Sequence, residues 1–408
     1  SDAGTNWMEA IRNKGAITTS HSINLAGGSE FSKFSTGISY MKQEGTLGKP
    51  AASDYSRFTV RMNSEHVLWR KDNLDIITFG ENLYYNHNQR SGIYTNGQYS
   101  NNISEMLRAN PLIPIYNESG EYYGYDDLNE AGWFGYNPYS TNPIAKMMYT
   151  DQGNNISKNY SLNMVGYLKV QPIKGLTYKG QVSYKQSSNS YRRYNGIYHL
   201  NDVGDRRTDD EVQQSMGMGW NWSVENTLNY KFDVKDEHHF DVLIGQSFQK
   251  SGFGMGEDIS ATASSTLFGT WDMAYLSNST ASAPLSATGA PRGDSVLSSF
   301  FGRVNYDWKE TYMASLIMRR DGSSRFAPGH RWGTFPSASL GWVMTNEKWM
   351  EKTAGWLDFL KIRASWGQNG NCNIGNFYYV SMVGFDEYGR YPFGNNKNGA
   401  SQGGYAMN

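Results

Sequence analysis

The segment Leu176-Thr177-Tyr178-Lys179-Gly180-Gln181-Val182-Ser183-Tyr184-Lys185 decides the fold class, because its polarity alternates without a break. Every even position is apolar or glycine, and every odd position is polar. Successive side chains of a β-strand point to opposite faces. The pattern therefore predicts a strand with one apolar and one polar face.

The same period of two recurs along the chain and predicts about twelve strands. Many exceed the roughly 5–6 residues usual in globular sheets, and they are long enough to cross a bilayer, which takes roughly 9–11 residues. Besides the opening segment, the predicted strands are 18–27, 33–44, 57–66, 72–86, 160–170, 222–232, 237–250, 296–308, 311–323, 331–346 and 357–368.

The connections between these strands alternate between short and long. Short turns are predicted at Gly27–Ser29, Val67–Arg70, Pro172–Gly175, Asp233–Asp236 and Lys309–Glu310, and long connections at about 45–56, 87–157, 190–215 and 251–295. Short turns on one side and long loops on the other are typical of outer-membrane barrels. The segment 347–356 departs from this rhythm, and we expect a brief helical turn on the periplasmic side there.

Two long connections differ in composition. The stretch 110–149 is too rich in Tyr, Trp and Phe for disorder, so we expect a folded extracellular loop. Ser277–Gly293 is rich in Ser, Thr, Ala, Pro and Gly, which predicts a mobile segment.

The composition agrees with a barrel and excludes several other classes. Aromatic residues make up 14% of the chain and charged residues 18%, yet the mean hydropathy is −0.64; globular chains carry about 25% charged residues. No window is apolar enough for a spanning helix. The formal charge of −1 and the lack of a dense Lys/Arg run argue against nucleic-acid binding. The single Cys372 excludes an intrachain disulfide.

We therefore predict an all-β fold, a transmembrane antiparallel β-barrel in the outer membrane of a Gram-negative cell. The chain opens at Ser1-Asp2-Ala3 without the apolar region of a signal peptide. It is expected to be a mature piece, cut from something larger.

Several motifs resemble SusC/RagA-type TonB-dependent transporters. Trp7–Ile11 followed by Ile23–Ser29 is similar to the start of the barrel in that family. Arg319–Phe326 leads into Arg331–Trp342, and Leu357–Asn371 is followed by Ile374–Asn376. The motifs keep their order from one end to the other, so the resemblance covers essentially all 408 residues.

The resemblance implies a barrel of roughly 22 strands filled by a plug domain, a SusD-like surface lipoprotein as partner, and energy delivered by TonB. Residues 1–408 would be the N-terminal and central part of the barrel, about 12–13 strands, with extracellular loops at about 87–157, 190–215 and 251–295. The plug is expected to lie outside residues 1–408. Open strand edges are not tolerated in lipid, so we expect the rest of the barrel and plug, membrane lipid and lipopolysaccharide as further partners.

A charged motif is the first candidate site. In Arg319-Arg320-Asp321-Gly322-Ser323-Ser324-Arg325 the strand is expected to end at the arginines, with a tight Asp-Gly turn after them. The structural interpretation is a turn held by Asp321 with Arg325. The three arginines around Asp321 could form a fixed polar cluster in the barrel wall or near its outer rim. The alternative to a structural role is contact with plug, lipoprotein or substrate.

Aromatic loop residues are the second candidate. Flat rings stack on sugars, and the loops offer Trp133, Tyr136 and Tyr139 near Asn137 and Asn142, and Trp271 and Tyr275 beside Asp272. These residues could bind an oligosaccharide, which the resemblance implies as the commonest substrate, or a peptide. They could equally pack the core of their own loops.

No metal or cofactor site is predicted. The acidic residues Asp202, Asp205, Asp209, Asp210 and Glu211 lack the spacing of a Ca²⁺ loop. His238 and His239 are adjacent on a strand and point to opposite faces.

The leading hypothesis is therefore TonB-dependent nutrient import, with no catalytic residues. A passive porin, an outer-membrane enzyme and a surface adhesin are the alternatives, and the motifs favour none of them.

Overall fold

The computed structural model describes residues 4–51, 53–95, 101–151, 155–252, 257–265, 268–279, 285–291, 295–376, 378–380, 383–391 and 402–407. No helix within these ranges is long and apolar enough to cross a membrane. By its internal contacts the chain divides into two units, which are described in turn. Unit 1 comprises residues 1–168, 181–222 and 252–292, and unit 2 comprises 169–180, 223–251 and 293–408.

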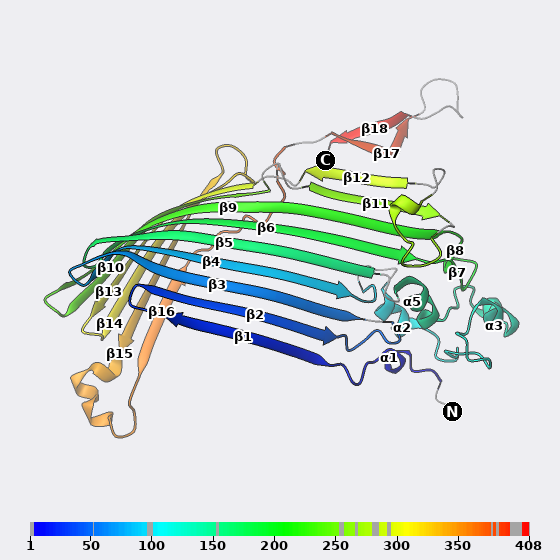
Figure 1. The fold of residues 1–408 in the computed structure, drawn as a ribbon, viewed down its shortest axis with the longest axis horizontal. Coiled ribbons are helices and arrows are strands. Elements are labelled where there is room, and N and C mark those ends of the chain that lie inside the picture. Colours follow the sequence, from blue (N-terminus) through cyan, green and yellow to red (C-terminus); the bar gives the residue numbers. More distant parts are fainter. Residues whose placement is uncertain are drawn as a thin grey trace. The chain divides into compact units, whose positions relative to one another are not determined.

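The main sheet runs in chain order, β1-β2-β3-β4-β5-β6-β9-β10-β13-β14-β15-β16, and its strands are labelled in Figure 1. Every predicted strand is present. The bounds are β1 (Thr18–Gly28), β2 (Ser32–Glu44), β3 (Asp54–Lys71), β4 (Leu74–Ser91), β5 (Asn155–Ile173), β6 (Leu176–Asn195), β9 (Asp210–Val234), β10 (His238–Ser251), β13 (Ser295–Trp308), β14 (Tyr312–Ser323), β15 (Trp332–Val343) and β16 (Lys361–Gly367).

Smaller pairs lie off this path. Strand β11 (Glu257–Ser265) pairs with β9 and with β12 (Leu285–Pro291), while β7 (Tyr198–His199) pairs with β8 (Arg206–Arg207). Strands β17 (Val383–Tyr391) and β18 (Gln402–Met407) form a separate antiparallel hairpin.

Unit 1 contains a sheet with two chemically different faces. Across β1 to β4 the register aligns Ile23, Ile38, Val60 and Tyr85. This apolar face is open, since Ile23 is 77% exposed. The prediction from period-two alternation is confirmed here.

The other face of unit 1 is polar. Tyr167 of β5 donates a hydrogen bond to Glu65 of β3 (2.8 Å), and its ring lies against Gly80, the register partner of Glu65. A Cβ at position 80 would lie 2.1 Å from that ring. Glycine at this position therefore lets the Tyr167 ring cross the backbone of β4.

The sheet of unit 2 also has one apolar and one polar face. Val304, Leu316, Ala338 and Trp366 share one face of β13 to β16, and Trp366 is 59% exposed. The opposite face carries polar pairs, such as Ser315 donating to Asn305 (2.7 Å). Both units thus expose a continuous apolar face, which in a folded protein marks contact with lipid or another apolar surface.

Most short turns lie where the sequence predicts them. Lys235-Asp236 and Lys309-Glu310 have φ between 51° and 56°, as in the two-residue turns whose twist matches a hairpin. Gly175 closes the turn between β5 and β6 with φ of 85°.

The predicted turn at Val67–Arg70 is wrong. These residues belong to β3, where the register shifts between Val67 and Trp69, and the hairpin turns instead at Asp72-Asn73, both with positive φ. Asp and Asn tolerate the left-handed conformation better than bulky residues. The break in alternation at Leu68 is a bulge rather than a strand end.

Two further predictions concern the end of β14 and the segment after β15. The helical turn predicted at 347–356 is confirmed by the 3₁₀ helix η3 (Lys348–Thr353), which follows a shorter one, η2 (Met344–Asn346). The tight turn predicted at Asp321-Gly322 is wrong, because β14 continues to Ser323 and Gly322 pairs with both Ser298 and Trp332.

The long connections are shorter than predicted. Strand β4 continues to Ser91, β6 reaches Asn195, and β9 is 25 residues long, which leaves 92–154 and 196–209 between strands. The ends of β4 and β6 are largely polar on both faces, so their alternation disappears while the strands continue. The early part of β9 keeps apolar residues at even positions, such as Val212, Met216 and Met218, and the predicted strand began too late. In Ser277–Gly293, predicted to be mobile, Leu285–Pro291 forms β12, while 280–284 and 292–293 lie outside the described residues.

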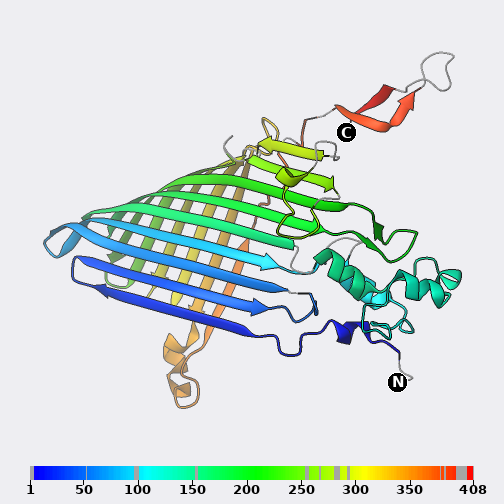
Figure 2. The same ribbon diagram turned by 45° about the vertical axis from the view of Figure 1, so that its right-hand side comes forward.

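The connection 92–154 folds into helices, which confirms the prediction of a folded loop. They are α2 (Asn102–Arg108), α3 (Tyr125–Glu130), α4 (Trp133–Tyr136) and α5 (Pro143–Asp151), joined by α1 (Trp7–Ala10) before β1. In both ribbon views the helices lie beyond the strand ends of β1 to β4, opposite the short turns of those strands (Figures 1 and 2).

Candidate functional site

The helices at the long-connection end of unit 1 share one hydrophobic core. Helices this short are marginal alone, so tertiary packing and side-chain caps must hold them. Asn142, fully buried, accepts hydrogen bonds from the amides of Ile144 (3.1 Å) and Ala145 (3.2 Å) at the start of α5. The buried residues of this core, called the loop core below, are Trp7, Ile11, Ala51, Ile93, Met106, Ile113, Leu128, Ile144 and Met147.

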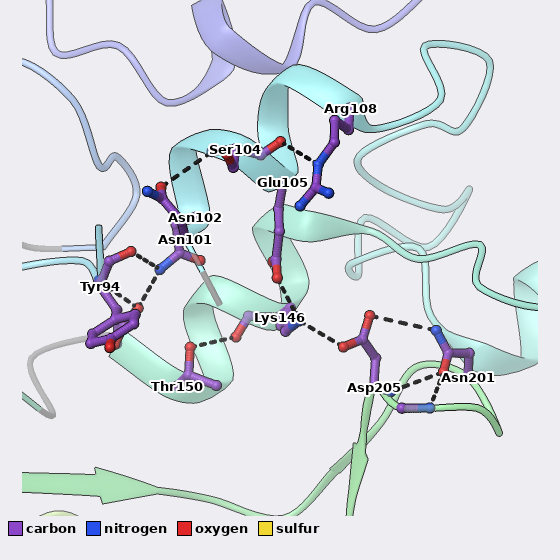
Figure 3. A network of polar contacts seen from close by, with 12 residues as sticks. Tyr94, Asn101, Asn102, Ser104, Glu105, Arg108, Lys146, Thr150, Asn201 and Asp205 are labelled. Carbon is purple, nitrogen blue, oxygen red and sulfur yellow. Dashed lines mark hydrogen bonds and ion pairs between the residues drawn. The ribbon is translucent and has the colours of Figure 1, made fainter. Parts of the chain in front are cut away.

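A buried ion cluster joins three segments of this region (Figure 3). Lys146 of α5 lies 2.8 Å from a carboxylate oxygen of Glu105 in α2 and 2.6 Å from one of Asp205, between β7 and β8. The three side chains are only 13–18% exposed. The cluster therefore fixes connection 196–209 against the helices of connection 92–154.

Burial and neighbouring charges shift the pKa values of both Glu105 and Lys146. Burial raises the pKa of Glu105, and the neighbouring charge of Asp205 raises it further, against the lowering effect of Lys146. For Lys146 burial opposes the charge, but hydrogen bonds to Asp205 and Glu105 outweigh it and raise the pKa. Lys146 thus holds together two carboxylates that would otherwise repel each other.

A second buried carboxylate anchors the helices to the sheet. Asp151, at the end of α5, is fully buried and accepts hydrogen bonds from the Tyr94 amide (3.1 Å) and from Asn102 Nδ2 (2.6 Å). Its other oxygen lies 3.7 Å from a guanidinium nitrogen of Arg193 in β6. The folded loop is therefore tied to a strand end as well as to the neighbouring connection.

Aromatic side chains gather on the surface of this assembly. Tyr125 stacks on His199 with ring centroids 3.9 Å apart and contacts Phe134 at 5.2 Å, while Trp133 meets Tyr136 edge-on at 6.4 Å. We call these five residues the outer aromatic cluster. Tyr136 is 81% exposed, so its ring is available to a ligand.

Asp202 provides the polar edge of the outer aromatic cluster. It accepts hydrogen bonds from Tyr125 Oη (2.8 Å) and from His199 Nε2 (2.8 Å), and Arg206 lies 3.6 Å away. The hydrogen bond from Tyr125, followed by that from His199, lowers the pKa of Asp202, and the same bond raises the pKa of Tyr125. Aromatic faces beside a fixed carboxylate can bind both the ring and the hydroxyl groups of a sugar.

The aromatic residues predicted to bind substrate lie in different parts of unit 1. Trp133 and Tyr136 come together, and Tyr139 is 66% exposed further along the same connection. Trp271 and Tyr275 lie elsewhere and flank Arg192 of β6, whose guanidinium carbon is 3.7 and 4.0 Å from their ring centroids. The sequence did not predict that Tyr125 stacks on His199, because the two residues belong to different connections.

The predicted cluster of Arg319, Arg320, Asp321 and Arg325 does not form. Arg319 binds Asp321 (2.7 and 2.9 Å), whereas Arg325 donates to the carbonyl of Cys372 (3.1 Å). Arg320 lies over the ring of Trp332 at 5.6 Å. The correction follows from strand geometry: Asp321 stays in β14, so Arg319 shares its face while Arg320 points to the opposite one.

The acidic residues of 202–211 have separate partners. Asp205 pairs with Lys146, Asp210 accepts from the Gly269 amide (2.7 Å), and Glu211 lies 3.2 Å from Arg207. Within the described ranges no group of three or more His, Cys, Asp or Glu could hold a metal ion.

Comparisons with known proteins give a consistent result. The chain is 27% identical to the TonB-dependent receptor SusC of Bacteroides thetaiotaomicron, over 96% of this chain and 38% of that protein. It is also 27% identical to a TonB-dependent receptor of Formosa agariphila, over 92% of the chain and 33% of that protein. The RagAB peptide importer superposes with a TM-score of 0.72 at 21% identity, over 99% of this chain and 41% of that one. No protein-family model matches.

The chain thus spans less than half the length of the relatives it matches. An antiparallel sheet with an exposed apolar face, short turns at one end and folded connections at the other has the barrel fold of TonB-dependent outer-membrane receptors. Within that class the chain is similar in sequence to SusC and in fold to the RagAB importer, as its motifs predicted. Its relatives are named as receptors and importers rather than enzymes.

Proposed function

We propose that the protein to which this chain belongs imports a nutrient across the outer membrane and draws its energy from TonB. The exposed apolar face would contact lipid, the polar face would line the interior, and the long-connection end would lie outside the cell. The names of the related receptors support this proposal. The exposed apolar residues on both units support it independently, because they need an apolar surrounding.

The outer aromatic cluster is the observation that carries the binding role. It presents the exposed ring of His199 beside Asp202 and the exposed ring of Tyr136, while Trp133 and Phe134 pack partly against the loop core. Buried charges hold this assembly in place. A preorganised surface of this kind loses little entropy on binding. Trp133, Tyr136 and Tyr139 would stack on the substrate, which we propose to be an oligosaccharide; a peptide, as taken by the RagAB importer, is the competing outcome of the test.

A SusD-like lipoprotein would cover this end and capture substrate first. Its docking would bury part of the exposed aromatic surface, since Tyr136 and Tyr139 are too exposed to serve the loop core. The rest of the barrel and the plug complete the transporter in this proposal.

Uptake by cells that carry the full-length protein tests these roles. Labelled oligosaccharides and peptides should be offered to the wild type, to the double variant Trp133→Ala/Tyr136→Ala and to the control Trp356→Ala, a 77% exposed tryptophan of unit 2. We expect glycan uptake to fall about tenfold in the double variant and to stay unchanged in the control. Uptake that persists without TonB would refute the energised mechanism, and uptake of peptides alone would refute the glycan assignment.

A further inference from the structure

A cavity of about 400 Å³ lies on unit 1, between the ends of β5, β6 and β9 and the segment 268–279. Its lining includes Lys158, Ser190, Arg192, Gln214, Trp271 and Tyr275. Two hydrogen bonds hold the covering segment in place, from the Leu276 amide to Gln214 (2.9 Å) and from the Gly269 amide to Asp210 (2.7 Å). The residues that cover the cavity are therefore fixed against β9.

The cavity opens on the apolar face of the sheet. Side chains two apart on a strand share a face, which places Lys158 with Met164 on β5 and Arg192 with Val182 on β6. Met164, Val182 and Met216 are 40%, 56% and 67% exposed. The two cations thus continue the apolar surface toward the long-connection end.

The level of the two cations corresponds to a membrane interface. Lys158 precedes Met164 by six residues, or about 20 Å of strand at about 3.3 Å per residue. Between them Tyr160 stacks on His87 with centroids 4.3 Å apart, and rings of this kind concentrate at lipid headgroup level. Acyl chains would contact Met164 and Val182, and a headgroup would lie beside Lys158 and Arg192.

The chemistry of the lining suits an anion. The guanidinium carbon of Arg192 lies 3.7 and 4.0 Å from the ring centroids of Trp271 and Tyr275, and Nη1 donates to the carbonyl of Ala274 (3.3 Å). This arrangement leaves the edge of the guanidinium for a phosphate oxygen. Lys158 has no ion-pair partner among the residues that the structure describes, so its charge is uncompensated there.

We propose that this cavity binds the phosphate of a phosphorylated glycolipid of the outer leaflet, with its acyl chains on the apolar face below. The proposal rests on the outer-membrane placement given above. Trp271 and Tyr275, which the sequence predicts to contact the substrate, would instead hold Arg192 in position. The ligand is therefore held on the outside of the wall rather than in its interior.

Native mass spectrometry of the full-length transporter tests the site. The purified protein would be given diphosphoryl lipid A, the same lipid without phosphates, or inorganic phosphate. The variants are Lys158→Gln and the rescuing Lys158→Arg. The control is Lys185→Gln, which removes an exposed lysine at an odd position of β6, on the polar face. Heat-modifiable migration on a gel reports whether each variant folds.

We expect Lys158→Gln to lower retention of diphosphoryl lipid A about fivefold or more, while Lys158→Arg and Lys185→Gln retain it. Equal retention by Lys158→Gln and the wild type, or equal binding of the dephosphorylated lipid, would overturn the proposal. Inorganic phosphate that binds as well as the lipid would show a free-anion site and overturn it too. Nutrient uptake measured on the same variants separates this inference from the import function, which Lys158→Gln should leave intact.

Discussion

Removing the central cation of the ion cluster is the sharpest test of how the outer loops are held. Lys146→Met leaves Glu105 and Asp205 facing each other without the charge that lies 2.8 and 2.6 Å from them. Breaking a buried ion pair by removing one partner costs about 3–5 kcal/mol. Because the three side chains keep 13–18% exposure, we take the lower limit, about 3 kcal/mol.

Hydrogen exchange in the full-length protein measures this cost locally. The amides of α2 and α5 should lose about 100-fold in protection, since about 1.4 kcal/mol corresponds to a factor of ten. Strands β2 and β3, which do not contact the cluster, should keep theirs. Lys14→Met is the matched control, because Lys14 also pairs with a glutamate, Glu9 at 2.5 Å, but is 71% exposed; it should leave protection in α2 and α5 unchanged.

A rescue separates the charge from the packing. In the triple variant Lys146→Met/Glu105→Gln/Asp205→Asn no buried charge remains unpaired, so most of the lost protection should return. If Lys146→Met loses no more protection than Lys14→Met, or if the triple variant is as unprotected as the single one, the cluster does not hold the loops and the reasoning is wrong.

Three further predictions use the same full-length protein. The raised pKa of Glu105 means that folding favours its protonated form, so its contribution is present at low pH and lost as pH rises through that pKa. Exchange protection in α2 should therefore increase in the wild type as pH is lowered from neutral toward the ordinary glutamate value of 4.5, and stay flat in Glu105→Gln. A rise in Glu105→Gln equal to that of the wild type would assign the effect to another group. Gly80→Ala should lower thermal stability by about 1–3 kcal/mol, because the new Cβ would meet the Tyr167 ring, whereas Gly166→Ala, with nothing within 4 Å, should not; equal melting temperatures would refute the close packing. A double-mutant cycle should show coupling of at most about 1 kcal/mol between Arg319 and Asp321 and none between Asp321 and Arg325, which bonds to Cys372; coupling in the second pair would restore the predicted cluster.

The strands could be predicted from the sequence because one face is apolar throughout. The period-two pattern of 176–185 places β6 correctly at its start, where the apolar face is continuous. It fails beyond Lys185, where both faces become polar and only backbone pairing continues to Asn195. The same loss of an apolar face explains the strand that runs through Asp321. The missed bulge at Leu68 has another cause, since three consecutive apolar residues, Val67 to Trp69, interrupt the alternation while the pairing continues.

The candidate site was harder to predict because its contacts join separate connections. Trp133 and Tyr136 are three residues apart, so their pairing could be expected from the sequence. Lys146 and Asp205 are far apart in the chain, and nothing in local composition indicates that they meet. Arg192 likewise gave no signal, since its neighbours Trp271 and Tyr275 come from the segment after β11.

Residues before β1 contribute to the loop core, and this feature governs the order of assembly. Thr5 donates to the carbonyl of Ile113 (2.7 Å) and Trp7 to that of Asn110 (3.0 Å), across 108 and 103 residues of chain. Closing such a span in a free chain is entropically unfavourable, and the cost falls once β1 to β4 have paired and shortened it. We therefore expect the loop core, and with it the proposed binding surface, to form after the hairpins of β1 to β4 are in register.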